Sequence, residues 1–189
     1  MKTIILEGIA TSGKSSLIQH LKTTLSDKLN IYVADEEETH VPIMKKPEGL
    51  HLSFYEELID TLTSNEPDLL IIDRLYLTQA FRANTDLTAY LTIENKLKLF
   101  DPITIFLKVE PAKIKERIQK AIEHRESRWG EYVLTKGDTP EQQAAYYVDQ
   151  QESQLELLKQ STLPYKIFDT SEHNYGKITQ EIINTLSLN

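Results

Sequence analysis

The chain has 189 residues, of which 40% are hydrophobic and 26% charged, and 29 acidic against 21 basic residues give it a net charge of −8. This length suits one globular domain, and the acidic balance argues against a nucleic acid polymer as the main partner, because backbone binding needs a dense basic surface. No apolar run is long enough to cross a bilayer, and the absence of cysteine excludes disulfides and thiolate metal sites. The amino-terminal segment is charged again at Glu7, too early for a secretory signal, so we expect a cytoplasmic protein without membrane contact.

Five short apolar runs alternate with amphipathic segments. In chain order the runs are residues 3–6, 31–34, 69–72, 103–109 and 165–168. Continuous apolar runs are typical of parallel strands that are covered on both faces. The spacing of apolar residues predicts helices over residues 14–28, 51–63, 94–100, 111–128, 140–158 and 177–186. The alternation predicts a single α/β domain over residues 1–189, whose ligands bind beyond the carboxyl ends of the strands.

Residues 8–15 read Gly-Ile-Ala-Thr-Ser-Gly-Lys-Ser and match the G-x-x-x-x-G-K-S pattern of a phosphate-binding loop, or P-loop. The match lies between a predicted strand and a predicted helix, which distinguishes it from a chance glycine-rich turn. Its glycines let main-chain N–H groups turn toward phosphate oxygens, and the helix adds its positive end. We expect Lys14 to reach the β- and γ-phosphates of ATP and the Ser15 hydroxyl to ligate Mg²⁺. The predicted nucleotide-binding residues are Gly8, Thr11, Ser12, Gly13, Lys14, Ser15 and Ser16.

Carboxylates follow two further predicted strands. Asp73 comes directly after the third apolar run and precedes Arg74. A carboxylate there can hold Mg²⁺ or take a proton from an attacking hydroxyl, and the arginine can bind a substrate phosphate or sugar. The second run is followed by four acidic residues, 35–38, of which Glu36 and Glu37 are the predicted substrate contacts. The sequence leaves open which carboxylate acts as the base, and a strand-end ion pair and a solvated acidic loop are the alternative interpretations.

A basic stripe follows one face of the helix predicted over residues 111–128. Its members are Lys113, Arg117, Lys120, His124 and Arg128. We interpret residues 120–145 as a lid and expect Arg125 and Arg128 to neutralise charge on a transferring phosphoryl group. For Lys113 and Lys120 a solvated helix face is the favoured interpretation.

Several segments resemble motifs of the thymidylate kinase and deoxynucleoside kinase group. Residues 6–16 are similar to the P-loop of that group, in which Glu-Gly opens the loop, and Asp73-Arg74 resembles the thymidylate kinase Asp-Arg motif. Residues 117–128 and 167–171 resemble the arginine-bearing lid and the last strand with its adenine-side loop. The resemblance covers nearly the whole chain. It implies a three-layer P-loop NTPase fold, with a five-stranded parallel sheet flanked by helices and a small helical lid, and phosphoryl transfer from MgATP to a nucleoside or nucleoside monophosphate.

The sequence departs from that group where the acceptor is bound. The Arg-x-Pro-Gly-Gly segment of thymidylate kinases is absent, since residues 38–42 read Glu-Thr-His-Val-Pro, and residues 52–56 contain no counterpart of the base-reading glutamine of deoxynucleoside kinases. Tyr55 is a predicted substrate contact, with aromatic core packing as the alternative.

The sequence therefore predicts a P-loop phosphotransferase for a small acceptor. Its predicted catalytic residues are Lys14, Asp73, Arg74, Arg125 and Arg128; its predicted substrate contacts are Glu36, Glu37, Tyr55 and Arg74; and its predicted Mg²⁺ ligands are Ser15 and Asp73. The alternatives are a P-loop kinase for an antibiotic, sugar or vitamin precursor and a regulatory NTPase without an acceptor. A homodimer is also left open.

Overall fold

The sheet at the centre of the fold contains five parallel strands. The structure, a computed structural model, describes residues 1–47, 50–64, 66–124 and 127–188, with the backbone alone given for residues 127 and 128. The strands are β1 (Lys2–Glu7), β2 (Ile31–Ala34), β3 (Leu69–Asp73), β4 (Pro102–Lys108) and β5 (Tyr165–Asp169). They pair in parallel in the order β2-β3-β1-β4-β5. All five predicted strands are confirmed, as is the α/β fold class.

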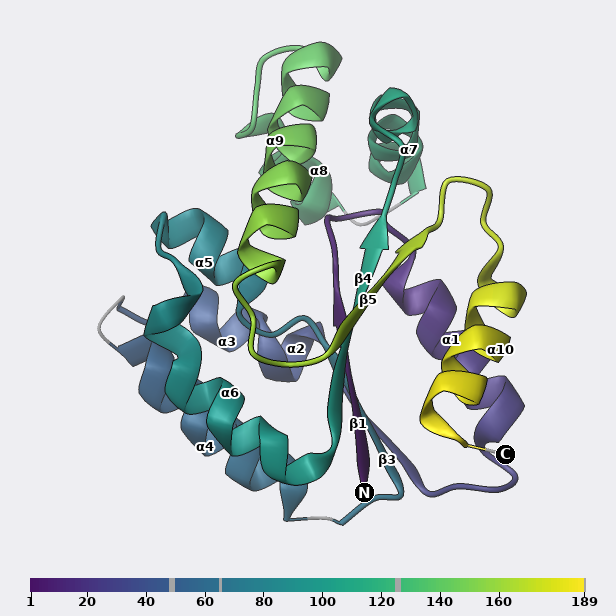
Figure 1. Ribbon diagram of the computed structural model, residues 1–189. Coiled ribbons are helices and arrows are strands. Elements are labelled where there is room, and N and C mark those ends of the chain that lie inside the picture. The colour runs from purple at the N-terminus through teal and green to yellow at the C-terminus, as the bar shows by residue number, and fades with distance from the viewer. Residues whose placement is uncertain (48–49, 65, 125–126, 189) are drawn as a thin grey trace.

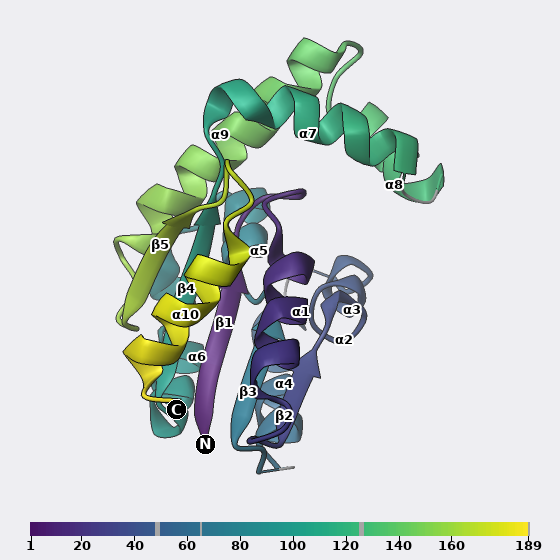
Figure 2. The same cartoon turned by 90° about the vertical axis from the view of Figure 1, so that its right-hand side faces the viewer.

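Helices cover both faces of this sheet and its carboxyl end (Figures 1 and 2). Their bounds are α1 (Lys14–Leu25), α2 (Glu36–Thr39), α3 (Val41–Met44), α4 (His51–Thr63), α5 (Leu77–Ala83), α6 (Leu91–Leu97), α7 (Pro111–His124), α8 (Ser127–Leu134), α9 (Pro140–Leu158) and α10 (Tyr175–Leu186). Two 3-10 helices, η2 (Leu87–Tyr90) and η3 (Lys98–Phe100), flank α6. Within the helix predicted over residues 111–128, α7 runs to His124 and α8 begins at Ser127, and residues 125 and 126 lie outside the described residues.

Two hydrophobic clusters hold the layers together. On one face, side chains of β1, β3 and β4 pack against Leu17 and Leu21 of α1 and against Ile178 and Ile182 of α10. On the other face, the strands pack against α4, α5 and α6, with Tyr55 of α4 fully buried. The strands are apolar on both faces for this reason, as in other buried parallel sheets.

A third hydrophobic cluster lies above the carboxyl end of the sheet. It joins Ile9 of the P-loop to Ile114 and Ile118 of α7, Val133 of α8 and Tyr147 of α9. Figure 2 shows α7, α8 and α9 arching over the strand ends. The P-loop therefore shares a core with the helices that cover it.

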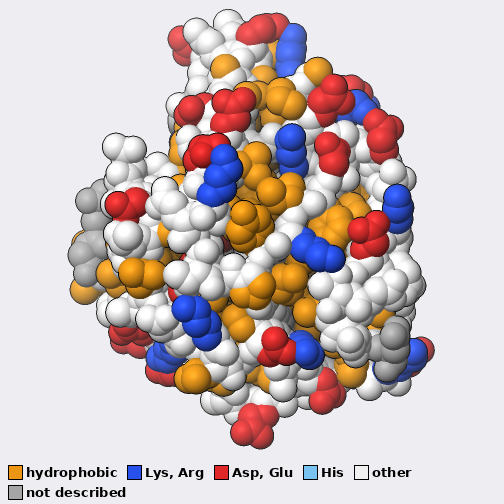
Figure 3. Space-filling view, in the orientation of Figure 1, with side chains coloured by type: hydrophobic (Ala, Val, Ile, Leu, Met, Phe, Trp, Pro, Cys, Tyr) orange, Lys and Arg blue, Asp and Glu red, His pale blue; other side chains and the backbone are white. Residues whose placement is uncertain are grey.

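The edge strand β5 remains partly uncovered. Figure 3 shows hydrophobic side chains gathered in the middle of the face on which β5 lies, and the side chains of Tyr165 and Ile167 are exposed. Among the described helices, none is both long and apolar enough to span a membrane.

Candidate functional site

The P-loop has a backbone conformation that only glycine adopts easily at two positions. Gly8 has a φ of 137° and Gly13 a φ of 98°, both in the left-handed range. A Cβ at Gly8 would lie 2.6 Å from the carbonyl oxygen of Leu107, and one at Gly13 would lie 2.0 Å from the Tyr175 hydroxyl. The two glycines thus let the loop curl tightly between β1 and α1, close to the neighbouring strand and to α10.

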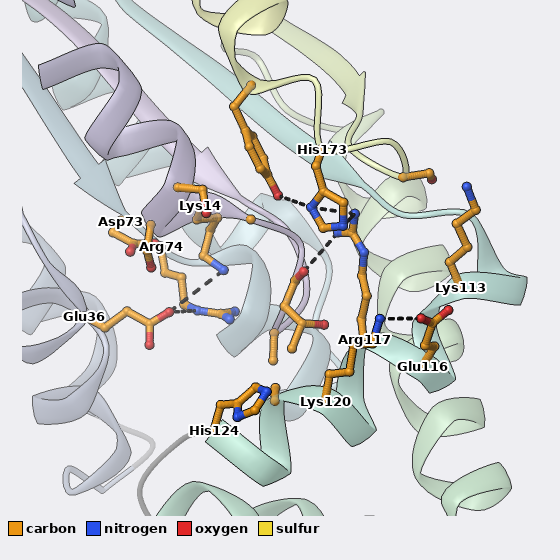
Figure 4. Close-up of a pocket in the computed structure, with 18 of the residues that line it drawn as sticks. Lys14, Glu36, Asp73, Arg74, Lys113, Glu116, Arg117, Lys120, His124 and His173 are labelled. Carbon is orange, nitrogen blue, oxygen red and sulfur yellow. Dashed lines mark hydrogen bonds and ion pairs between the residues drawn. The ribbon is translucent and has the colours of Figure 1, made fainter. Parts of the chain in front are cut away.

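A cavity of about 940 Å³ opens beside this loop. Five of the predicted nucleotide-binding residues line it, namely Thr11, Gly13, Lys14, Ser15 and Ser16. Gly8 and Ser12 do not line it. The carbonyl oxygen of Gly8 accepts hydrogen bonds from the side chains of Lys14 and Arg74. The carbonyl oxygen of Ser12 accepts a hydrogen bond from the Thr170 hydroxyl. The remaining lining comes from the ends of β2 and β3, from α7 and from the loop after β5 (Figure 4).

Lys14 is buried at the start of α1 and folds back over the loop. Its Nζ donates to the carbonyl oxygens of Gly8 and Ile9, each at 3.3 Å, and lies 3.9 Å from Oε1 of Glu36. Burial and the charge of Arg74 lower the pKa of Lys14, Asp73 and Glu36 oppose them, and the net result is a pKa of about 8. Lys14 is therefore charged at neutral pH but releases its proton far more easily than an exposed lysine.

Arg74, which is buried, and Glu36, whose side chain is 46% exposed, form an ion pair at the cavity. Arg74 Nε donates to Glu36 Oε1 at 2.5 Å, and its Nη1 donates to the Gly8 carbonyl at 3.1 Å and to the Thr78 hydroxyl at 3.0 Å. Burial raises the pKa of Glu36, but Arg74 and Lys14 outweigh it and hold this pKa at about 2. The Glu36 carboxylate is thus ionised at neutral pH. Figure 4 shows it pointing at both cations.

The structure distinguishes among the four acidic residues after β2. The Asp35 carboxylate accepts from the main-chain N–H groups of Glu37 and Glu38 and so caps the start of α2. Glu38 accepts a 2.7 Å hydrogen bond from the Tyr32 hydroxyl. Glu37 lines the cavity, but Glu36 alone of the four contacts Lys14 and Arg74. The acidic run is therefore the beginning of a short helix that brings Glu36 to the P-loop.

Asp73 ends β3, next to β1 in the sheet, and lines the cavity. Burial raises its pKa, and Lys14 and Arg74 partly counter this. Its Oδ1 atom is buried without a hydrogen-bond partner among the described residues. Asp73 and the exposed Ser15 line the same cavity, and their carboxylate and hydroxyl oxygens are of the kind that Mg²⁺ prefers as ligands.

Tyr55 was predicted as a substrate contact, and this prediction is wrong. Tyr55 belongs to α4, and its side chain is fully buried in the core. Its hydroxyl donates to the carbonyl oxygen of Leu75 at 2.7 Å. The aromatic ring packs 6.2 Å from the ring of Tyr90. Tyr55 belongs to the core beneath the site and does not line the cavity.

The basic stripe of α7 divides into surface and buried members. Lys113 pairs with Glu172 and Lys120 with Glu116, both at the rim, in agreement with the solvated face favoured for them. Arg117 is buried and donates to the carbonyl oxygens of Thr11 and Thr170 and to the Thr170 hydroxyl. It thereby connects the P-loop with the loop after β5 (Figure 4).

The predicted lid arginines are not placed. Arg125 lies outside the described residues, and only the backbone of Arg128 is described, at the start of α8. Their roles in phosphoryl transfer remain predictions.

The sequence interpretation missed two residues that shape the site. Glu7 is buried beneath the P-loop, where its Oε1 atom accepts from the main-chain N–H groups of Leu75 and Leu77 and so holds the segment after Arg74. Tyr175 lies against Gly13, and its hydroxyl oxygen is 3.3 Å from His173 Nδ1. The Glu-Gly pair that opens the loop is a sequence signal for Glu7, whereas no local pattern marks Tyr175.

Comparison with known proteins identifies the fold. No protein-family model matches the chain, and no curated protein is similar in sequence. Many solved structures are similar to this one, and three of them, which cover nearly the whole chain, serve as examples. The YorR protein from Bacillus subtilis, in complex with phosphorylated GDP, has a TM-score of 0.65 and 21% identity, covering 99% of this chain and 96% of that one. Shikimate kinase from Acinetobacter baumannii in complex with shikimate has a TM-score of 0.61 and 16% identity, covering 98% and 93%. Thymidylate kinase from Candida albicans has a TM-score of 0.57 and 20% identity, covering 99% and 92%.

At these identities the likeness concerns the fold. The chain has the three-layer α/β fold of the P-loop kinases, as the resemblance of its motifs to thymidylate kinases predicted.

Proposed function

We propose that this chain is an ATP-dependent phosphotransferase that moves the γ-phosphoryl group of MgATP to a small acceptor, a nucleoside or a nucleoside monophosphate. One observation carries the proposal: the P-loop and the Glu36–Arg74 pair face the same cavity from adjacent strand ends. A loop for phosphates and an ionised carboxylate held by an arginine are the two parts that phosphoryl transfer to an acceptor requires.

Each group has a task in this proposal. The P-loop N–H groups and Lys14 hold the triphosphate, and Arg74 offers the two N–H groups of its Nη2 to an acceptor or a transferred phosphoryl oxygen. Glu36 orients the acceptor and takes the proton of its hydroxyl as the new O–P bond forms and the bond to ADP breaks. With a monophosphate acceptor no proton transfer is needed, and Glu36 then keeps Arg74 and Lys14 in position. Ser15 and Asp73 would hold Mg²⁺, which would offset the negative charge of the phosphates.

A second acceptor class is a non-nucleotide hydroxyl compound. The fold likeness to shikimate kinase in complex with shikimate supports it as much as the likeness to thymidylate kinase supports a nucleotide. The described residues of the site contain no feature that requires a nucleobase.

The test measures ADP release with MgATP and a panel of nucleosides, nucleoside monophosphates and small hydroxyl compounds. We expect at least one acceptor to stimulate turnover, and Lys14→Ala to abolish it while the far-UV circular dichroism spectrum stays unchanged. Slow ATP hydrolysis that no acceptor stimulates would instead indicate a regulatory NTPase. If calorimetry with Mg²⁺ detects no binding of any purine triphosphate, the proposal is wrong in its first step.

A further inference from the structure

Arg82 on α5 has no carboxylate partner among the described residues, in contrast to Arg74, which pairs with Glu36. Arg117 also lacks one, but it donates to main-chain carbonyl oxygens of the P-loop and of the loop after β5. The partners of Arg82 are uncharged side chains. Its Nη1 lies 3.2 Å from His40 Nε2, and its Nη2 donates to the Tyr132 hydroxyl at 2.6 Å. A half-buried guanidinium without a carboxylate partner is unusual, because burial of an unpaired charge is costly.

Lys136 adds a second cation at the same place. Its Nζ lies 4.3 Å from the centre of the Tyr132 ring and 5.0 Å from that of Tyr146. In the described part of the chain, no carboxylate lies within ion-pairing distance of Arg82 or Lys136. Two cations therefore share Tyr132 of α8, with aromatic rings and a histidine as their neighbours.

His40 carries a donor that has no partner. Because a guanidinium only donates, His40 Nε2 accepts from Arg82, and the ring proton lies on Nδ1. Burial, together with Arg74 and Arg82, lowers the pKa of His40 to about 3, so the ring is neutral. The side chain is 6% exposed, and its Nδ1 atom has no hydrogen-bond partner among the described residues.

The Tyr147 hydroxyl is a second orphaned group in this region. It is buried without a hydrogen-bond partner among the described residues. Its ring packs 5.3 Å from the ring of Tyr146, and Lys136 Nζ lies 5.0 Å from the centre of that same Tyr146 ring. The unsatisfied Tyr147 hydroxyl therefore belongs to the same group of side chains as Lys136.

We propose that Arg82, Lys136, His40, Tyr132 and Tyr147 form a subsite for an anionic group of the acceptor, a phosphate or a carboxylate. The inference rests on the proposed phosphotransferase function and narrows its substrate class. Each of the five side chains offers an N–H or O–H donor, and no described carboxylate competes for them. An anion with several acceptor oxygens matches this set, whereas an uncharged nucleoside would leave both cations uncompensated. Because Tyr132 belongs to α8, the bound anion would also tie the helices above the site to α5.

The variants that test the subsite are Arg82→Gln and Lys136→Gln, with Lys159→Gln as the matched control, since Lys159 pairs with Glu156 on the exposed end of α9. Each protein is first saturated with a non-hydrolysable ATP analogue and Mg²⁺, so that the P-loop is filled. Inorganic phosphate and acetate are then titrated, and the signals of the His40 ring are followed by NMR. We expect saturable binding of at least one anion to the wild type and the control, and its loss in Arg82→Gln. Binding that is equal in all four proteins, or absent from the wild type, overturns the subsite.

Turnover then distinguishes the two sources of the anion. Acceptors are offered in matched pairs, a nucleoside with its 5′-monophosphate and a hydroxy acid with its amide. We expect the charged member of one pair to be used, and Arg82→Gln to raise its KM roughly 10- to 100-fold, the value of a hydrogen bond to a charged group. Lys136→Gln should raise it less, and KM for ATP should not change. Equal use of both members of every pair overturns the inference but leaves the kinase function standing. Absence of ATP binding overturns both.

Discussion

Glu36 is the residue through which the site differs from a simple nucleotide-binding loop. Its carboxylate contacts both Lys14 and Arg74, and its neighbours in the acidic run are committed elsewhere. We expect Glu36→Gln to lower kcat roughly 100- to 10,000-fold with a hydroxyl acceptor, the contribution typical of a general base. ATP affinity should change little, because the P-loop is intact. Glu38→Gln, which removes a negative charge from the same acidic run but leaves an oxygen to accept from the Tyr32 hydroxyl, is the control. Steady-state kinetics on both variants checks the expectation.

Lys14 gives the site a measurable pH dependence. Its pKa of about 8 in the free protein means that the side chain is largely neutral at pH 9. Bound phosphates favour the charged form and raise this pKa, so ATP binding at pH 9 takes up a proton. It follows that affinity for ATP falls as the pH rises through about 8. Calorimetry in buffers of different ionisation enthalpy measures the proton directly. A binding enthalpy that is independent of buffer at pH 9 would contradict the shift.

At the scale of elements, Arg117 connects three segments that are distant in the sequence. From α7 it reaches the P-loop at Thr11 and the loop after β5 at Thr170. Replacement by Gln leaves buried carbonyl oxygens without their donor, so we expect Arg117→Gln to lower the free energy of unfolding by about 1–3 kcal/mol. It should also weaken ATP binding, since Thr11 lines the cavity. Lys120→Gln is the control, because the only described ion pair of Lys120 is an exposed one with Glu116. We expect this variant to leave both the free energy of unfolding, measured by urea titration, and the ATP affinity, measured by calorimetry, unchanged.

The sequence predicted the long elements well and the short ones poorly. The strands and the helices over residues 51–63 and 140–158 carry enough apolar residues at regular spacing to be recognised. Helices α2, α3 and α5 have four to seven residues, too few for a periodic pattern, and α2 depends on a cap, the Asp35 carboxylate. These short elements are the ones that place Glu36 and Arg82.

At the scale of the whole molecule, the P-loop could be predicted as a unit because its chemistry is local in the sequence. Two partners of Arg74 could not, because Gly8 and Glu36 approach it only when β1 and β2 both lie beside β3. The same holds for Arg82, whose neighbours are His40, between α2 and α3, and Tyr132 of α8. The acceptor is selected by such long-range contacts. A sequence pattern therefore indicates the class of reaction more readily than its substrate.

Ligand binding at such a site should stabilise the entire fold. Ile9 of the P-loop packs with α7, α8 and α9, and Lys14 begins the helix that covers one face of the sheet, so the loop belongs to the common core. A ligand at 100 times its Kd adds about 2.7 kcal/mol to the free energy of unfolding. For a chain of this size, we therefore expect MgATP to raise Tm by about 5–10 °C. Lys14→Ala should show little of this increase, while Lys159→Gln should show all of it. Differential scanning calorimetry with and without MgATP makes the measurement, and an equal rise in Lys14→Ala would mean that the nucleotide binds elsewhere on the molecule.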